Sequence, residues 1–260
     1  MKLDLAAKTA VVTGASRGIG LATVQALTAE GVRVVGAART ITSELKETGA
    51  ITVSADLSTA AGARTLIDAA LAEFGGIDLL VNNVGGGDDL AVQGFLDTDD
   101  EQWASILDIN LLSTVRVSRS ALPSLVERKG AIVNVSSVVA HLPALGPVAY
   151  STAKAALTAL GKSLAEEFGP QGVRVNTVSP GLVRSSIYDS PEKFGGQVAA
   201  VFGMDIPDFI EQAPGALGIT TGRLVEPKEV ASLITFLLSD VTASITGADY
   251  LIDGGQLKAV

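Results

Sequence analysis

Three polar side chains between Asn134 and Lys154 could together transfer a proton. Tyr150 and Lys154 are four residues apart, so on a helix both side chains project from the same face. Ser137 lies upstream, where an apolar run typical of a strand ends. An ammonium group beside a phenol favours the phenolate, so we expect Lys154 to lower the pKa of Tyr150. Bringing a tyrosine from its reference pKa to about 7 takes roughly 4 kcal/mol.

A glycine-rich turn near the N-terminus has the features of a phosphate-binding turn. The apolar run 9–12 leads into TGASRGIG, and apolar residues at helical spacing follow. Gly14, Gly18 and Gly20 would let the backbone approach a pyrophosphate, and the start of the helix would supply N–H groups and positive potential. We therefore expect a nucleotide cofactor at this turn.

The same turn also fits G-x-S-x-G, the nucleophile turn of serine hydrolases. In that alternative Ser16 would be the nucleophile, His141 the base, and Asp56 or Asp78 the acid. The chain lacks the HGGG-type segment that forms an oxyanion hole, and the turn would follow the first strand. The hydrolase is therefore the weaker interpretation.

The elements that position these residues alternate regularly between strands and helices. The pattern predicts an α/β fold, with a parallel sheet of about seven strands, right-handed crossovers and helices on both faces. We interpret residues 1–260 as a single domain, because no linker interrupts the pattern. Strands are expected at 9–12, 32–37, 51–55, 77–81, 131–136, 173–178 and 248–252. Helices are expected at 21–31, 43–48, 60–74, 99–128, 148–168 and 227–238.

Residues 184–223 break this rhythm. The segment carries several aromatic and apolar residues among glycines and prolines. A connection of this length in a compact domain is usually functional or disordered. We expect a substrate lid with short helices of its own, the alternative being a surface insertion that contributes to an oligomer contact.

Composition excludes several kinds of site. The chain has no cysteine and one histidine, so thiolate and multi-histidine metal sites, disulfides and cysteine nucleophiles are impossible, and no metal is expected. The net charge of −9 disfavours nucleic acid as a partner. No apolar run is long enough to span a bilayer, so no membrane partner is expected. The lack of cysteine fits a cytoplasmic location.

Taken together and in this order, the motifs resemble the short-chain dehydrogenase/reductase family, including its bacterial 3-oxoacyl-carrier-protein reductases. They are TGASRGIG, NNVG, Asn110, Ser137, Tyr150 with Lys154, and Pro180-Gly181, and the likeness runs from about residue 5 to residue 256. The resemblance implies a Rossmann fold. It also implies reduction of a ketone or 3-oxoacyl carbonyl to a secondary alcohol, or the reverse, by hydride transfer.

The resemblance assigns roles to four catalytic residues. Tyr150 would be the general acid/base, and Ser137 would hydrogen-bond the same substrate oxygen. Lys154 would hold the nicotinamide ribose hydroxyls, and Asn110 would position a water that links Lys154 to solvent. Asn82 is expected to brace the sheet. His141 lies between Ser137 and Tyr150 and could contact substrate.

The residues after the second strand predict NADP(H) rather than NAD(H). An NAD site needs an acid there to accept the ribose hydroxyls, but Ala38 occupies the position where NAD enzymes of the family carry Asp. Arg39 and Arg17 would suit a 2′-phosphate through charge-assisted hydrogen bonds. The cofactor-binding residues predicted in all are Gly14, Ser16, Arg17, Gly18, Ile19, Gly20, Arg39, Asp56, Leu57, Asn83, Val84, Gly85, Tyr150, Lys154, Pro180, Gly181, Val183 and Ser185.

The predictions for the substrate and the partners rest on the lid and on the family resemblance. The apolar lid favours a small-molecule carbonyl or alcohol with an apolar body. Arg128 matches a position where carrier-protein reductases dock their acidic partner, whereas Gln171 replaces a base at another. The family is mostly tetrameric or dimeric through its two longest helices, so a homotetramer or homodimer is expected. A non-catalytic NADP-binding protein is a further alternative.

Overall fold

The computed structural model describes residues 2–86 and 91–258, and within them seven strands form one parallel sheet. The strand order is β3-β2-β1-β4-β5-β6-β7, so the sheet grows in both directions from the β1–β4 pair. This confirms the predicted doubly wound fold. The strands are β1 (Thr9–Thr13), β2 (Arg33–Ala38), β3 (Ile51–Ser54), β4 (Leu79–Asn82), β5 (Ala131–Val135), β6 (Arg174–Pro180) and β7 (Asp249–Ile252).

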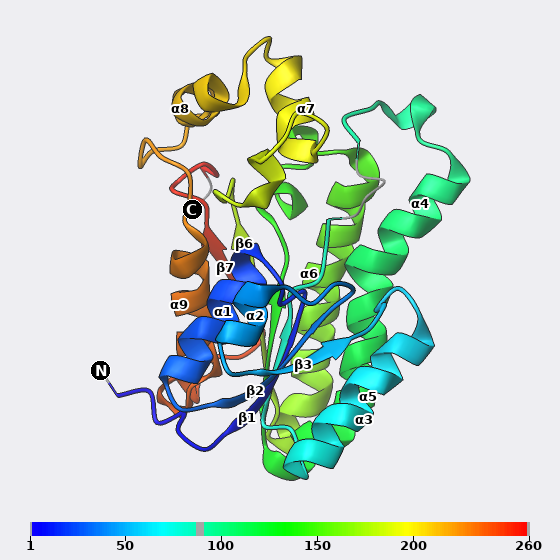
Figure 1. Cartoon of the computed structure of the whole chain (residues 1–260), viewed down its shortest axis with the longest axis vertical. Helices are drawn as coiled ribbons and strands as arrows, with labels where there is room; N and C mark the ends of the chain where they lie inside the picture. The colour runs from blue at the N-terminus through cyan, green and yellow to red at the C-terminus, as the bar shows by residue number, and fades with distance from the viewer. Residues whose placement is uncertain (1, 87–90, 259–260) are drawn as a thin grey trace.

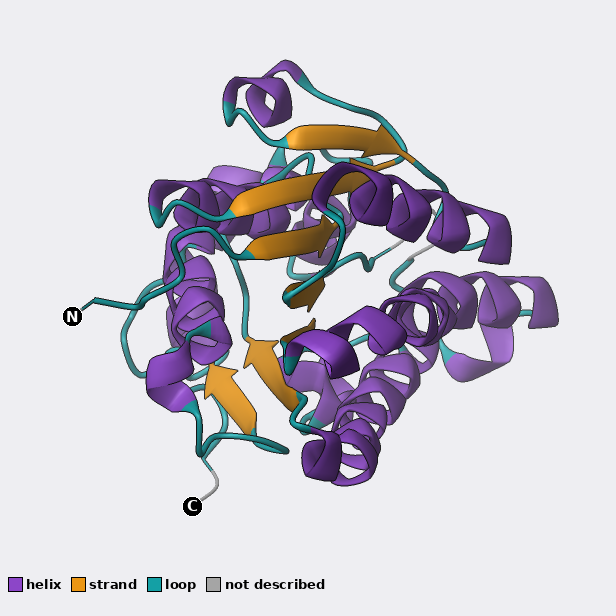
Figure 2. Cartoon of the chain, turned by 90° about the horizontal axis from the view of Figure 1, so that it is seen from below, coloured by secondary structure: helices purple, strands orange, loops and turns teal. Residues whose placement is uncertain are grey.

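Helices cover both faces of the sheet. Figure 1 shows α1, α2 and α9 on one side and α3, α5 and α6 on the other, and Figure 2 shows the strands as a layer between them. The first group is α1 (Gly18–Ala29), α2 (Ser43–Glu47) and α9 (Pro227–Leu238). The second group is α3 (Ala60–Phe74), α5 (Ser113–Arg128) and α6 (Val148–Phe168).

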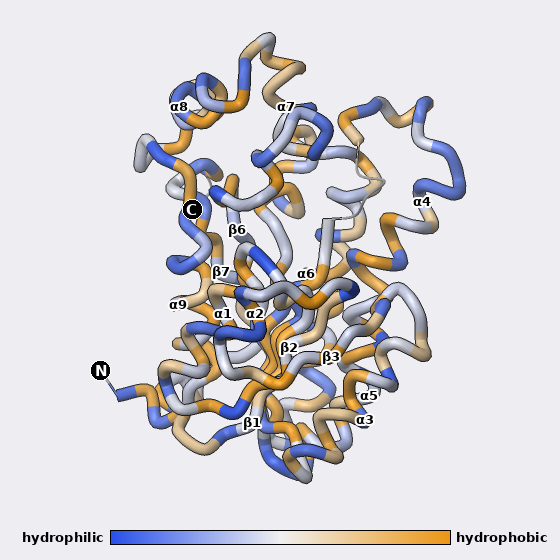
Figure 3. The backbone as a smooth tube through the Cα atoms, in the orientation of Figure 1, coloured by the Kyte–Doolittle hydropathy of each residue, from blue (hydrophilic) through white to orange (hydrophobic). Residues whose placement is uncertain are grey.

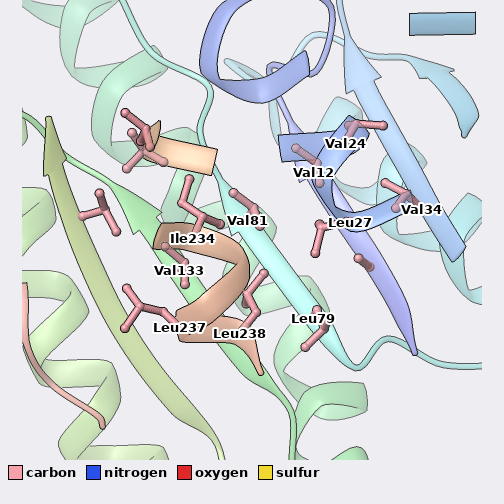
Figure 4. Packing of buried hydrophobic residues seen from close by; sticks show 14 of the residues in the cluster. Val12, Val24, Leu27, Val34, Leu79, Val81, Val133, Ile234, Leu237 and Leu238 are labelled. Carbon is pink, nitrogen blue, oxygen red and sulfur yellow. The ribbon is translucent and has the colours of Figure 1, made fainter. Parts of the chain in front are cut away.

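The core has two layers because the central strands are buried on both faces. Val12 of β1 belongs to the cluster beneath α1 and α9, whereas its neighbour Val11 belongs to the cluster beneath α3 and α5. This is why the strands read as unbroken apolar runs, and Figure 3 shows the hydrophobic colour along them. Figure 4 shows the first cluster, which includes Val12, Val24, Leu27, Val34, Leu79, Val81, Val133, Ile234, Leu237 and Leu238.

The helical region expected over residues 99–128 is confirmed, and it contains a π-helical turn. It consists of α4 (Asp100–Leu107), a π-helical turn (Asp108–Leu112) and α5. Asn110 lies in the π-helical turn, and its side-chain Nδ2 donates to the carbonyl of Ile106 at 2.9 Å. A π-turn inside a helix commonly marks a functional position. The π-helical turn inside this helical region was not predicted.

Residues 184–223 form a small layer beyond the carboxyl end of β6. The layer contains α7 (Phe194–Val201) and α8 (Ile206–Ala216), which lie at the top of Figure 1. Tyr188 and Phe209 are buried in a cluster confined to this part of the chain and the residues just after it. Across the described ranges, every helix is too short or too polar to cross a bilayer.

Candidate active site

Ser137, Tyr150 and Lys154 meet where β5 ends and α6 begins. Ser137 follows β5 and starts a short 3-10 turn (Val138–Ala140). Its hydroxyl lies close enough to the phenol of Tyr150, in the first turn of α6, to favour a lower pKa for that phenol. The Lys154 Nζ lies 5.6 Å from the centroid of the Tyr150 ring and donates to the carbonyl of Val135 at 2.9 Å. The three groups expected to act together are thus brought together.

The neighbouring Ser136 has a different partner. Its Oγ donates to the carbonyl of Lys154 at 3.0 Å and accepts from Thr158 Oγ1 at 3.0 Å. Both contacts join the end of β5 to α6. Ser136 therefore fixes the helix that carries Tyr150 and Lys154, and Ser137 is the serine directed at the phenol.

Burial dominates the electrostatics of the pair. It raises the pKa of Tyr150 to about 12, against the opposing effect of the Ser137 hydrogen bond. It also lowers the pKa of Lys154 to about 8. The expected fall in the pKa of Tyr150 is therefore wrong for the chain on its own, because burial disfavours the charged form of each group. A protonated phenol is nevertheless the form that a proton donor requires.

Asn110 is fully buried, and its side chain is committed to protein partners. Its Oδ1 accepts from Gly86 N at 2.8 Å, and its Nδ2 donates to Gly86 O at 2.7 Å. These bonds fasten the segment after β4 to the π-helical turn. A Cβ added to Gly85 would lie 3.0 Å from both Asn110 Oδ1 and Lys154 Nζ, so Gly85 sits between the two side chains.

The glycine turn after β1 leaves no room for side chains. A Cβ on Gly20 would lie 2.1 Å from the carbonyl oxygen of Gly14, and one on Gly14 would lie 2.8 Å from Asn83 Nδ2. Asn83 in turn donates to the carbonyls of Thr13 and Gly14 at 3.0 and 3.2 Å. The turn ends at Arg17, which is extended and exposed and offers no side-chain cap to α1. The free N–H groups of α1 and the close backbone fit a pyrophosphate.

Arg39 and Asp56 lie together at the carboxyl ends of β2 and β3. Ala38 is 8% exposed and Arg39 is exposed beside it. Hydrogen bonds from Ser58, and more weakly the charge of Arg39, lower the pKa of Asp56. Its Oδ1 accepts from Ser58 N at 3.0 Å and from Ser58 Oγ at 2.7 Å, while Leu57 is buried.

The turn after β6 approaches the glycine turn. A Cβ on Gly18 would lie 3.6 Å from Ser185 Cβ, which places Ser185 beside the start of α1. Val183 forms a parallel bridge with Val225, and Gly181 is pressed against the backbone of Asp253. The residues predicted to bind the cofactor thus lie at the carboxyl ends of the strands, on turns or near the starts of α1 and α6, the edge where doubly wound sheets bind ligands.

Two groups near the site were missed. Thr13 is fully buried, and its Oγ1 accepts from the backbone N–H groups of Asn83 and Val84 at 2.9 and 3.0 Å. Its position at the end of β1, directly before the glycine turn, could have identified Thr13 from the sequence. Trp103 of α4 and Phe194 of α7 pack with Tyr150 in an apolar cluster. No local spacing links these two residues to the tyrosine, because they meet only through the fold.

The side chains required for a serine hydrolase are engaged elsewhere. His141 Nε2 lies 2.7 Å from Asp249 Oδ2, so neither proposed acid is its partner. Asp78 accepts from Thr9, and Asp56 accepts from Ser58. The described residues therefore do not form the Ser-His-acid arrangement that the alternative needs.

Known proteins of one enzyme family resemble this chain over nearly its whole length. A family model described as enoyl-(acyl carrier protein) reductase matches residues 14–256. The chain is 35% identical to the 3-oxoacyl-acyl-carrier-protein reductase of Vibrio cholerae, with 98% of this chain and 99% of that protein covered. It is 36% identical to NADPH carbonyl reductase 2 of Sus scrofa, with 100% of both covered. The structure of L-sorbose reductase from Gluconobacter frateurii, complexed with NADPH and L-sorbose, matches with a TM-score of 0.91 at 29% identity over 100% of both chains. The chain belongs to the short-chain dehydrogenase/reductase family of oxidoreductases.

Proposed function

We propose that this protein is an NADPH-dependent reductase that converts a ketone with an apolar body into a secondary alcohol, or catalyses the reverse reaction. The observation that carries the proposal is the grouping of Ser137, Tyr150 and Lys154 beside the turns that fit a dinucleotide. Family membership and the NADPH complex of L-sorbose reductase support the same chemistry.

The chain's own residues supply the proton and orient the carbonyl. Tyr150 is protonated at neutral pH, as an ordinary phenol is, and burial raises its pKa further, to about 12, so its hydroxyl can donate to a substrate oxygen. Ser137, which lies near that hydroxyl, would hold the same oxygen. Lys154 lies close enough to stabilise the phenolate left after transfer. NADPH, when bound, supplies the hydride. Asn110 would keep Gly86 and the π-helical turn in place.

Turnover with Tyr150→Phe tests the proposal directly. The wild type is screened with NADPH against aryl ketones, 3-oxoacyl thioesters and ketoses. Removing the proton donor is expected to lower kcat on the best substrate by 10²- to 10⁴-fold or roughly 2.7–5.4 kcal/mol, while NADPH binding is retained. Near-wild-type reduction by the variant would contradict the assignment. NADPH binding by the wild type without turnover on any substrate would favour the non-catalytic alternative.

The preference for NADPH rests on Arg39 and Arg17, which would bind the 2′-phosphate. Ala38 offers no acid to the ribose hydroxyls of NADH. A hydrogen bond to a charged group contributes about 1.5–3 kcal/mol, or roughly 10- to 150-fold in affinity. Arg39→Ala should therefore reduce kcat/KM for NADPH by at least about tenfold and leave that for NADH nearly unchanged. Equal losses with both cofactors would refute the role.

The substrate's apolar body would contact the cluster around Tyr150. Trp103 and Phe194 pack against the same buried core as Tyr150, and the proposed lid, residues 184–223, carries Phe194. A carrier-protein substrate is less well supported, because Arg128 already pairs with Asp78 at 3.6 Å and donates to Gly75 O at 3.3 Å. We therefore expect a free aryl or alkyl ketone to be reduced with a higher kcat/KM than its carrier-protein thioester counterpart.

A homodimer or homotetramer would form through α5 and α6, whose outer faces enclose a groove of about 590 Å³. Leu122, Leu160 and Leu164 make the groove apolar, and Arg119 and Glu167 lie on its opposite helices. A two-fold axis could pair each Arg119 with the Glu167 of a second copy. Arg119→Glu should dissociate the oligomer in analytical ultracentrifugation, and adding Glu167→Arg should restore it. A wild-type monomer would refute the interface.

The expected location of the protein remains the cytoplasm.

A further inference from the structure

We propose that His141 is a positioning residue which, held by Asp249, fixes the segment after β5 so that Ser137 stays against Tyr150. The inference rests on the proposed function, because its consequence is measured on carbonyl reduction. The geometry that carries it is a hydrogen-bonded connection from His141 through Asp249, the first residue of β7, to Ser179 of β6.

Two protein groups orient the carboxylate of Asp249. Its Oδ1 accepts from Ser179 Oγ at 2.7 Å, and its Oδ2 lies 2.7 Å from His141 Nε2. Ser179 is fully buried on β6, directly before the Pro180-Gly181 turn, and the Asp249 side chain is 16% exposed. Both carboxylate oxygens are thus oriented by partners, unlike those of a freely rotating surface acid.

The chain between Ser137 and His141 is short and internally bonded. Ala140 N donates to Ser137 O at 3.0 Å, and His141 N donates to Val138 O at 2.9 Å. Val139 N also donates to Ser137 Oγ at 3.3 Å. A shift of His141 therefore moves the backbone that carries the Ser137 hydroxyl.

The remainder of this loop is anchored separately. Ser151 of α6 donates to the carbonyl of Pro143 at 3.2 Å, which holds the part of the loop that approaches Tyr150. The His141–Asp249 contact holds the part nearest Ser137. Loss of the histidine contact should therefore loosen Ser137 while leaving Tyr150 and the glycine turn in place.

The first test separates kcat from KM. His141→Leu and Asp249→Leu should each lower kcat by about fivefold, the effect of about 1 kcal/mol for one hydrogen bond. The KM for NADPH should not change. The double variant should lose no more than either single variant, and His141→Gln, whose amide can still donate to Asp249, should recover most of the activity. Wild-type kcat in His141→Leu, additive losses, or no rescue by glutamine would each overturn the proposal.

The second test does not depend on activity. The chain has one histidine, so proton NMR of the untagged protein gives a single imidazole C2–H signal to follow. Asp249→Leu should move that signal, and Glu166→Leu, a control at an exposed acid on α6, should not. An unmoved signal in Asp249→Leu would overturn the proposal by showing that the pair does not form in solution. If the wild type reduced no carbonyl, the proposed function and the positioning role would both fall, whereas the NMR result would still report the contact.

Discussion

Replacing Lys154 with methionine tests how strongly burial lowers the pKa of the Lys154 ammonium group. The Lys154 side chain is almost fully buried, with the residue 2% exposed, and its pKa falls from an ordinary 10.5 to about 8 because it is desolvated. One pKa unit corresponds to about 1.4 kcal/mol, so folding the protonated lysine costs about 3 kcal/mol more than folding the neutral amine. Methionine keeps the unbranched apolar stem and removes this charge.

The sign of the pH dependence follows from proton binding. Between pH 8 and pH 10.5 the unfolded chain holds more protons on Lys154 than the native protein does, so the stability of the wild type rises with pH. Lys154→Met lacks this pH-dependent contribution to the free energy of unfolding. Its stability relative to the wild type should therefore be greatest at pH 7 and should fall by about 2–3 kcal/mol by pH 10. Loss of the bond to Val135 O subtracts about 1 kcal/mol at every pH and leaves the slope unchanged.

The assay is urea unfolding of both proteins without cofactor at several pH values from 7 to 10. Lys162→Met is the matched control, because Lys162 lies on the same helix with its side chain 59% exposed. Its stability difference from the wild type should stay nearly constant over that range. Parallel pH profiles for Lys154→Met and the wild type would refute the conclusion that burial controls the ammonium group.

Three further predictions concern neighbouring contacts. Arg174 donates to the carbonyls of Leu237, Leu238 and Ser239 at the end of α9, so Arg174→Met should lower the free energy of unfolding by about 2–4 kcal/mol, with a loss below about 1 kcal/mol contradicting this. Thr13→Val removes the acceptor for two backbone N–H groups and should destabilise by about 2–3 kcal/mol in the same urea assay, whereas unchanged stability would argue against those bonds. Gly85→Ala places a Cβ 3.0 Å from Lys154 Nζ and should lower kcat/KM at least about tenfold, and wild-type kinetics would show that the neighbours yield freely.

The sheet and most helices could be predicted because their signals are local. Strands buried on both faces read as continuous apolar runs, and Gly75, in the left-handed conformation at the end of α3, marks where that helix stops. The π-helical turn could not be predicted in this way. It depends on the contact between Asn110 and Gly86, which lie 24 residues apart.

In the candidate site, too, local relationships could be predicted from the sequence and effects of the fold could not. Tyr150 and Lys154 lie one helical turn apart, so their proximity was readable from the sequence. The direction of the tyrosine pKa was not, because the expectation considered the ammonium group and not the desolvation of both side chains. Phe194 was missed as a neighbour of Tyr150 because α7 meets α6 only in the folded chain.

The apolar cluster around the phenol gives the protein a built-in optical reporter. Trp103 is the only tryptophan in the sequence, and it packs in the same cluster as Tyr150. Its emission overlaps the absorption of a reduced nicotinamide, so energy transfer between them would report cofactor occupancy without any label. The same indole would sense a ketone entering beside the phenol. Binding and turnover could thus be timed separately in one stopped-flow experiment on the unmodified chain.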